Sequence, residues 1–291
     1  EHGISLFGDI PIYVLHDSAD FRGNRELFLT DEEGIPNKVA GVPPDYFAKE
    51  GQLWGNPLYD WDAMAQNGYA WWVRRIRHMC SIYDVVRIDH FRGFAGYYAI
   101  PYGNKTAEGG RWRTGPGYAL FAAIKKKLGE PRIIAEDLGF LTDDVNALLR
   151  KCGYPGMKVL EFGFDSRDGG DYRPHGYPVN SIAYVGTHDN EPVNGWMATA
   201  APEDVARAVR YLNLTKQEGY HWGMMRGIWA SAAELSIVQA QDLLGLGHEA
   251  RMNTPSTLGG NWCWRAKRGA FNDRLAVKLH DLTELYGRLP E

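Results

Sequence analysis

Residues 85–90 read Val-Val-Arg-Ile-Asp-His, a short apolar run that ends in charged and polar side chains. In a strand, Arg87 and Asp89 point to one side, while Val86 and Ile88 point to the other. A guanidinium group next to a carboxylate favours the ionised form of that carboxylate. The segment therefore predicts a buried strand that ends in an ionised acid. A purely structural Arg–Asp pair is an alternative of equal weight.

Similar apolar runs recur along the chain and alternate with helical patterns. We expect strands at Ile4–Ile12, Val85–Asp89, Arg132–Glu136, Met157–Phe162, Ser181–Gly186 and Ile237–Leu243. We expect helices at Tyr69–Tyr83, Tyr118–Leu128, Asp143–Lys151, Glu203–Leu212, His221–Glu234 and Arg274–Gly287. This alternation predicts an α/β fold in which helices cover a parallel sheet.

The residues that follow the strands favour a (β/α)8 TIM-type barrel over a doubly wound nucleotide-binding fold. No GxGxxG or GxxxxGK loop follows any of the predicted strands. The strands lead instead into acids, namely Asp9, Asp89, Glu136 and Asp189. Barrel enzymes carry their chemistry at the C-terminal ends of successive strands.

Composition excludes several classes of protein. The chain has 291 residues and a formal net charge of −4, and no basic cluster marks a nucleic-acid binder. No apolar run is long enough to predict a membrane span. The three cysteines, Cys80, Cys152 and Cys263, form no CxxC pair, so we expect buried thiols and a cytoplasmic protein rather than disulfides or a zinc site.

Two further strand ends carry candidate catalytic acids. Arg132–Asp137 ends in Glu136 and Asp137, and a carboxyl group at an apolar strand end retains its proton as a general acid must. Ser181–Gly186 leads into Thr187–Asn190, a polar cluster that suits substrate binding or a hydrogen-bonded loop corner. Retaining glycosidases need two carboxyl groups only ~5–5.5 Å apart, a spacing that neighbouring barrel strands can provide.

With these motifs the chain resembles the amylomaltase, or 4-alpha-glucanotransferase, family (glycoside hydrolase family 77). Four segments resemble conserved regions shared with α-amylases: 8–14 (GDIPIYV), 87–94 (RIDHFRGF), 135–139 (AEDLG) and 187–190 (THDN). Longer stretches resemble this family in particular: 41–47, 51–57, 241–245, 250–255 and 260–262.

The resemblance implies a retaining double-displacement reaction on α-1,4-glucans and maltooligosaccharides. Asp89 stands in the place of the nucleophile, Glu136 in that of the acid/base and Asp189 in that of the acid that stabilises the transition state. The residues expected to bind substrate are Arg87, His188, Asp9, Asp45, Tyr46, Phe47, Gln52, Trp54 and Asn253. No metal or organic cofactor is implied.

Residues 45–61 are expected to form an aromatic lid that excludes water, with Tyr59 and Trp61 as packed anchors. Where the family has glycine this chain has Ser256, so we expect a different loop backbone there. The sequence opens at what resembles the third barrel strand, so we expect residues 1–291 to form strands 3 to 8 of one catalytic barrel domain. An α-amylase-like hydrolase and an inactive glucan-binding fragment remain as alternatives, as does a plastid location.

Overall fold

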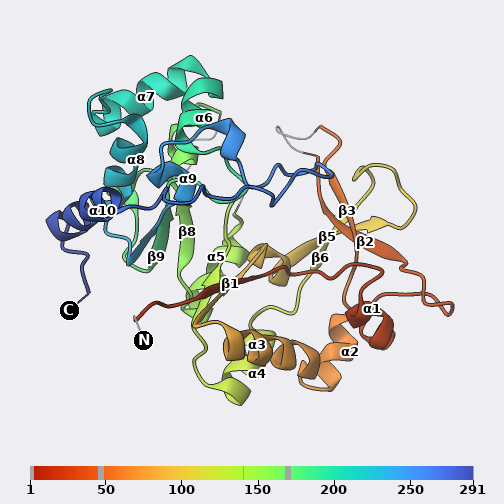
Figure 1. The fold of residues 1–291 in the computed structure, drawn as a ribbon. Coiled ribbons are helices and arrows are strands. Elements are labelled where there is room, and N and C mark those ends of the chain that lie inside the picture. Colours follow the sequence, from red (N-terminus) through yellow and green to blue (C-terminus); the bar gives the residue numbers. More distant parts are fainter. Residues whose placement is uncertain (1–2, 45–48, 140, 168–171, 291) are drawn as a thin grey trace. The chain divides into compact units, whose positions relative to one another are not determined.

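The computed structural model describes residues 3–44, 49–139, 141–167 and 172–290, which fold into two compact units (Figure 1). Unit 1 comprises Glu1–Gly156 and unit 2 comprises Met157–Glu291. Each unit contains a three-stranded sheet with helices between its strands, so the predicted α/β class is confirmed. None of the described helices is long and apolar enough to cross a lipid bilayer.

Unit 1 contains a parallel sheet with the strand order β1-β4-β7. Its strands are β1 (Phe7–Ile10), β4 (Val85–Ile88) and β7 (Ile133–Ala135). They alternate with helices that lie close to the predicted positions, namely α3 (Ala70–Ile82), α4 (Tyr118–Leu128) and α5 (Asp143–Cys152). The register pairs Asp9 with Arg87 and Arg87 with Ile134, so β4 forms the centre of the sheet.

The core of unit 1 forms where the apolar side of β4 meets these helices. Val86 and Ile88 are fully buried, and they belong to one cluster with Trp72 and Ile76 of α3 and with Phe121 of α4. Burying large apolar side chains is the main favourable contribution to folding. The alternation predicted for β4 is therefore confirmed. Its valine and isoleucine side chains pack into the core, and Arg87 lies on the other side of the strand.

A second sheet in unit 1, antiparallel with the order β3-β2-β5-β6, was not predicted. Its strands are β2 (Lys38–Val42), β3 (Gln52–Pro57), β5 (Gly96–Pro101) and β6 (Arg111–Thr114). At Gly41 a Cβ atom would lie 2.2 Å from the Gln52 carbonyl oxygen, so only glycine allows β2 and β3 to approach this closely. Two short helices complete the unit, α1 (Ala19–Gly23) and α2 (Trp61–Gln66).

Unit 2 carries the strand order β10-β9-β8, in which β9 and β10 pair in parallel. The strands are β8 (Gly156–Val159), which begins at the boundary of the units, β9 (Ser181–Tyr184) and β10 (Leu235–Ile237). The helices are α6 (Val193–Thr199), α7 (Pro202–Leu212), α8 (Tyr220–Trp229), α9 (Ala240–Leu243) and α10 (Asp273–Leu285). Its apolar cluster includes the fully buried Met224, Met225 and Ile228 of α8.

The strand predicted at Ile237–Leu243 is wrong over most of its length. The strand ends at Ile237, and α9 begins at Ala240. Two polar residues of this helix are buried, because Gln241 donates to the Ala250 carbonyl and Asp242 accepts from the Val193 amide. A polar side chain with such partners can be buried. Because buried residues of this helix are polar, hydrophobic periodicity does not predict it.

Two smaller predictions also need correction. The strand predicted at Met157–Phe162 ends at Val159 and continues as the 3-10 helix Leu160–Phe164. The cysteines are free thiols as predicted, but Cys80 and Cys263 are exposed and only Cys152 is partly buried. Burial raises the pKa of the Cys152 thiol to about 12, so this thiol is inert at neutral pH.

Candidate active site

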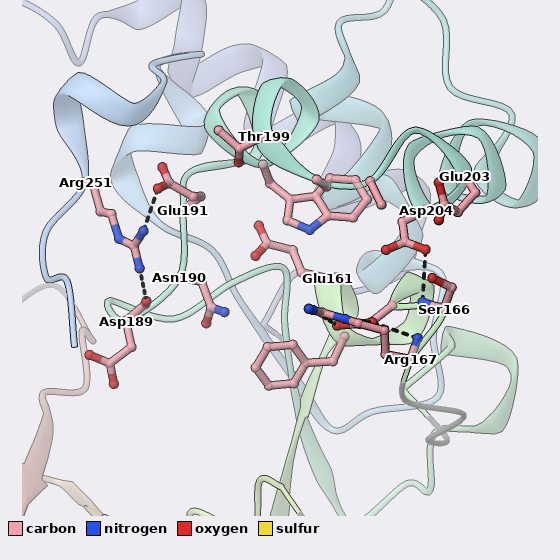
Figure 2. A pocket seen from close by; sticks show the side chains of 15 residues that line it. Glu161, Ser166, Arg167, Asp189, Asn190, Glu191, Thr199, Glu203, Asp204 and Arg251 are labelled. Atoms are coloured by element: carbon pink, nitrogen blue, oxygen red, sulfur yellow. Dashed lines mark hydrogen bonds and ion pairs between the residues drawn. The ribbon is translucent and has the colours of Figure 1, made fainter. Parts of the chain in front are cut away.

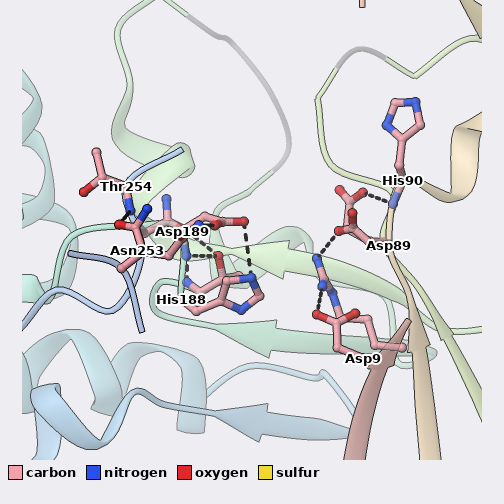
Figure 3. A network of polar contacts seen from close by, with 12 residues as sticks. Asp9, Asp89, His90, His188, Asp189, Asn253 and Thr254 are labelled. Atoms are coloured by element: carbon pink, nitrogen blue, oxygen red, sulfur yellow. Dashed lines mark hydrogen bonds and ion pairs between the residues drawn. The ribbon is translucent and has the colours of Figure 1, made fainter. Parts of the chain in front are cut away.

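In unit 1, Arg87 lies between two carboxylates at the C-terminal ends of β1 and β4 (Figure 3). Its Nη2 lies 2.9 Å from Asp89 Oδ1, and its Nη1 is paired with Asp9 Oδ2. The arginine side chain is 11% exposed, whereas those of Asp9 and Asp89 are 44% and 43% exposed. The sheet thus buries the cation and presents both acids to solvent. Such pairing favours ionised carboxylates.

Glu136 follows β7 and is held by two backbone amides. The His90 amide lies 2.7 Å from Oε2 and the Leu138 amide lies 2.8 Å from Oε1. Burial, and secondly the charge of Asp89, raises the pKa of Glu136 to about 7, although Arg87 and the two amides act in the opposite direction. Near neutral pH this carboxyl group can therefore hold a proton and release it, as a general acid/base must.

The backbone between β4 and Glu136 explains this arrangement. His90 has φ 51° and ψ 49°, a left-handed conformation that is uncommon outside glycine. The Glu136 amide bonds to the Ile88 carbonyl, and the Phe91 amide bonds to the Glu136 carbonyl. These bonds hold the ends of β4 and β7 together, so Asp89 and Glu136 share one end of the sheet.

Two predicted substrate residues on β3 lie beside this group of acids. The Trp54 ring packs edge-on against the His90 ring with centroids 4.7 Å apart, and Trp54 is 37% exposed. Its indole nitrogen donates to Gln52 Oε1 at 3.0 Å. Burial lowers the pKa of His90 to about 3, so the imidazole is neutral at physiological pH. An exposed aromatic ring at this place can contact a sugar.

The remaining lid residues divide into two groups. Asp45, Tyr46 and Phe47 lie outside the described residues. Tyr59 is buried and its hydroxyl donates to the Ile12 carbonyl, while Trp61 packs against the core of unit 1. The prediction that Tyr59 and Trp61 are structural anchors is confirmed.

In unit 2, Asp189 follows β9 and contacts Asn253, which is distant in sequence, and its neighbour His188 (Figure 3). Asn253 Nδ2 donates to Asp189 Oδ1 at 2.6 Å, and His188 Nε2 lies 3.4 Å from Asp189 Oδ2. Asn190 accepts from the amide and the hydroxyl of Thr187, so the segment also has the hydrogen-bonded loop corner that was considered as an alternative. Asp189 remains 41% exposed and accessible to a ligand.

A cavity of about 450 Å³ in unit 2 includes Asp189 in its lining (Figure 2). Its other lining residues are mostly polar and include Asn190, Glu191 and Arg251, together with the aromatic Trp196. The volume lies in the range of small-molecule sites, and polar groups beside the aromatic side chains of Phe162 and Trp196 suit a carbohydrate. Among the described residues no group of three or more His, Cys, Asp or Glu side chains could hold a metal ion.

Two polar residues near Asp189, Glu191 and Arg251, have no predicted role. Glu191 and Arg251 form an ion pair with an Nη1–Oε1 distance of 2.5 Å, and both are largely buried. Glu161 and Asp242 are buried acids in the same unit. Arg251 lies in a segment that resembles the family, but no local pattern identifies its partners Glu191 and Asp189, because they lie about 60 residues away.

Comparison with known proteins gives a consistent result. The family model described as 4-alpha-glucanotransferase matches residues 1–271. A 4-alpha-glucanotransferase of Clostridium butyricum is 49% identical over 98% of this chain and 59% of its own length. A chloroplastic/amyloplastic 4-alpha-glucanotransferase of Arabidopsis thaliana is 47% identical over 99% of this chain and 50% of its own length.

The fold has a close counterpart among solved structures. The amylomaltase from Streptococcus agalactiae, solved in complex with acarbose, superposes with a TM-score of 0.95 at 42% sequence identity. The match covers 99% of this chain and 58% of that protein. The chain therefore spans between about half and three fifths of the length of these relatives.

Proposed function

Because the chain belongs to the 4-alpha-glucanotransferase family, we propose that it carries the catalytic residues of a retaining transfer between α-1,4-glucans. The supporting observation is the difference between two acids at one end of a sheet. Asp89 is exposed and paired with Arg87, whereas Glu136 has a pKa of about 7. A retaining enzyme needs one ionised carboxylate and one protonated carboxyl group.

In the first step Asp89 attacks the anomeric carbon while the bond from that carbon to the glycosidic oxygen breaks. Glu136 gives its proton to this oxygen, and the shortened glucan leaves with a free 4-hydroxyl group. In the second step Glu136 takes the proton of an acceptor 4-hydroxyl, whose oxygen attacks the anomeric carbon and releases Asp89. Two inversions give net retention, and both carboxyl groups return to their initial states.

The other predicted residues are proposed to bind the sugar. Asp189, supported by Asn253, would stabilise the transition state, and His188 would bind sugar hydroxyl groups. Asp9 would share Arg87 with Asp89, and Trp54 would present an aromatic face near Glu136. Acarbose, present in the amylomaltase structure, is a suitable probe for this site.

We further propose that residues 1–291 form part of one TIM-type barrel, with the two three-stranded sheets as strands 3 to 8. The superposition with an amylomaltase supports this assignment. A cytosolic or plastid location is proposed in line with the bacterial and chloroplastic relatives.

Incubation of the protein with maltotriose tests the function. We expect glucose and a ladder of longer maltooligosaccharides, with little net gain of reducing ends. In Asp89→Asn we expect activity to fall by at least about 10⁴-fold, because the nucleophile is removed. A net gain of reducing ends would identify a hydrolase instead. Binding of acarbose without turnover, in a chain that unfolds cooperatively, would identify a glucan-binding fragment.

A further inference from the structure

The guanidinium group of Arg251 joins two segments that are far apart in the sequence of unit 2 (Figure 2). Its Nη2 donates to the Asp189 carbonyl at 2.7 Å, and its Nε donates to the Asn253 carbonyl at 2.9 Å. The Asn253 amide in turn donates to the His188 carbonyl at 3.1 Å. One side chain thus fixes the backbone on both sides of the contact between Asn253 Nδ2 and Asp189 Oδ1.

Glu191 fixes the orientation of this guanidinium group. Its Oε1 lies 2.5 Å from Arg251 Nη1, and its side chain is only 14% exposed. His248 Nδ1 lies 2.9 and 3.1 Å from the two oxygens of the same carboxylate, and Gln239 Nε2 donates to the Glu191 carbonyl at 3.3 Å. A planar guanidinium held at three corners has little rotational freedom.

We propose that Arg251 is a positioning residue for Asp189. It acts through the backbone and through Asn253, and Glu191 acts as its anchor. This inference rests on the proposed function of Asp189 as the acid that stabilises the transition state. Preorganised groups at such a place contribute most when they do not need to reorganise during the reaction. Displacing a catalytic group by about 1 Å costs about 100-fold in rate.

Unit 2 contains a matched control for this proposal. Arg226 makes a similar set of contacts, with Nε 2.7 Å and Nη2 3.0 Å from the Glu218 carboxylate and Nη2 3.0 Å from the Leu212 carbonyl. Its side chain is 28% exposed, comparable with 19% for Arg251. Arg226→Lys therefore removes an equivalent arginine–carboxylate pair away from Asp189.

The experiment compares Arg251→Lys, Arg226→Lys and wild type by hydrogen–deuterium exchange of peptides covering residues 188–190 and 251–254. Lysine keeps the charge but cannot reach three acceptors from one planar group. In Arg251→Lys we expect exchange of these peptides at least about tenfold faster, because bonds to charged donors are lost. On maltotriose we expect kcat to fall about 100-fold with little change in KM. Arg226→Lys leaves both readouts close to wild type.

Each outcome has a defined meaning. Unchanged exchange in Arg251→Lys, or equal acceleration in Arg226→Lys, overturns the positioning role. If Arg251→Lys does not fold, Glu191→Gln decides instead, because it removes the anchor and should accelerate exchange of the same peptides. Asp189→Asn separates the two proposals. If this variant retains transfer activity, the proposed role of Asp189 fails. The exchange data still test whether Arg251 holds the backbone at Asp189 and Asn253.

Discussion

The two units present acids at strand ends in different ways. In unit 1, two backbone amides hold Glu136, and one buried arginine pairs with the exposed Asp9 and Asp89. In unit 2, Asp189 is held by the side chain of Asn253, and its backbone is held by Arg251. Glu136 is thus held by backbone amides of residues 90 and 138, whereas the position of Asp189 depends on the side chains of Asn253 and Arg251, more than 60 positions away.

Unit 2 also contains buried acids whose pKa values are raised. Burial and the charges of Asp242 and Glu191 raise the pKa of Glu161 well above its ordinary value. Burial raises the pKa of Asp242 to about 7. Among the described residues, Glu161 Oε1, Asp242 Oδ2 and Gln239 Oε1 are buried without a hydrogen-bond partner. Unit 2 therefore contains buried acids, Glu161 and Asp242, whose ionisation lowers the stability of the folded chain.

Beyond the loss expected for Asp89→Asn, the largest effect is expected at Glu136 in unit 1. Glu136→Gln removes the transferable proton, so kcat on maltotriose should fall by about 10²–10⁴-fold. In the wild type the acid is lost as pH rises through about 7, so the first step should slow above that pH. A maltosyl fluoride donor needs no protonation of its leaving group. With this donor, formation of the glycosyl-enzyme should be largely restored in Glu136→Gln. In the wild type, the decrease in the rate of this step at high pH should disappear.

Asp89→Asn provides the control, because it removes the nucleophile and should not be restored by the fluoride donor. Equal behaviour of the two variants with both donors would contradict the assignment of separate roles to Asp89 and Glu136.

An intermediate effect concerns stability in unit 2. The ordinary pKa values of Asp242 and Glu161 are 3.8 and 4.5, but the folded chain keeps these protons to higher pH. Between about pH 4 and 7 the unfolded chain has lost the Asp242 proton that the folded chain retains, so the free energy of unfolding falls as pH rises, by about 1.4 kcal/mol per unit for this group. Glu161 acts in the same direction as pH rises above its ordinary pKa. Glu161→Gln and Asp242→Asn should each flatten this dependence in denaturant unfolding at pH 5 and 7.5.

The exposed Glu203 offers a matched control for that measurement. Glu203→Gln should leave the pH dependence as in the wild type. A parallel decline with pH in all four proteins would contradict the assignment to the buried acids.

The smallest expected effect concerns the loop of unit 2 that carries Asn253. Ser256 has φ 63°, in the left-handed region that favours glycine. Ser256→Gly should therefore stabilise the protein by up to about 1 kcal/mol, because it relieves backbone strain. Ser256→Ala keeps the Cβ atom and should give no such gain. Thermal unfolding of the two variants measures the difference, and an equal change in both would exclude backbone strain as the cause.

Local patterns predicted much of unit 1. The alternation of Val86, Arg87 and Ile88 correctly predicted β4 and the side of the strand on which Asp89 lies. A strand with one side in the core shows this alternation directly in its sequence. The antiparallel sheet was missed because its central pairing joins β2 to β5 across two helices, α2 and α3, and two strands, β3 and β4. Gly41, for example, pairs with Tyr98.

The candidate site was predictable to different degrees. The resemblance to a family pointed to Asp89, Glu136 and Asp189 as candidate catalytic acids, and the structure adds the hydrogen bonds and the pKa of Glu136. The partnership of Arg251 with Glu191 depends on folding of the whole unit and has no local pattern. The buried Asp242 was read as part of a strand, because periodicity cannot distinguish a satisfied polar group from an exposed one.

The antiparallel sheet has an evolutionary consequence. Strands β2 and β3 belong to the connection that follows β1, and β5 and β6 belong to the connection that follows β4. Trp54 lies on β3, whereas the His90 ring that it contacts precedes β5. The two connections therefore form one structural module. Shortening or exchanging either connection alone would displace the aromatic ring from the acids, so natural variants and loop grafts should alter both together.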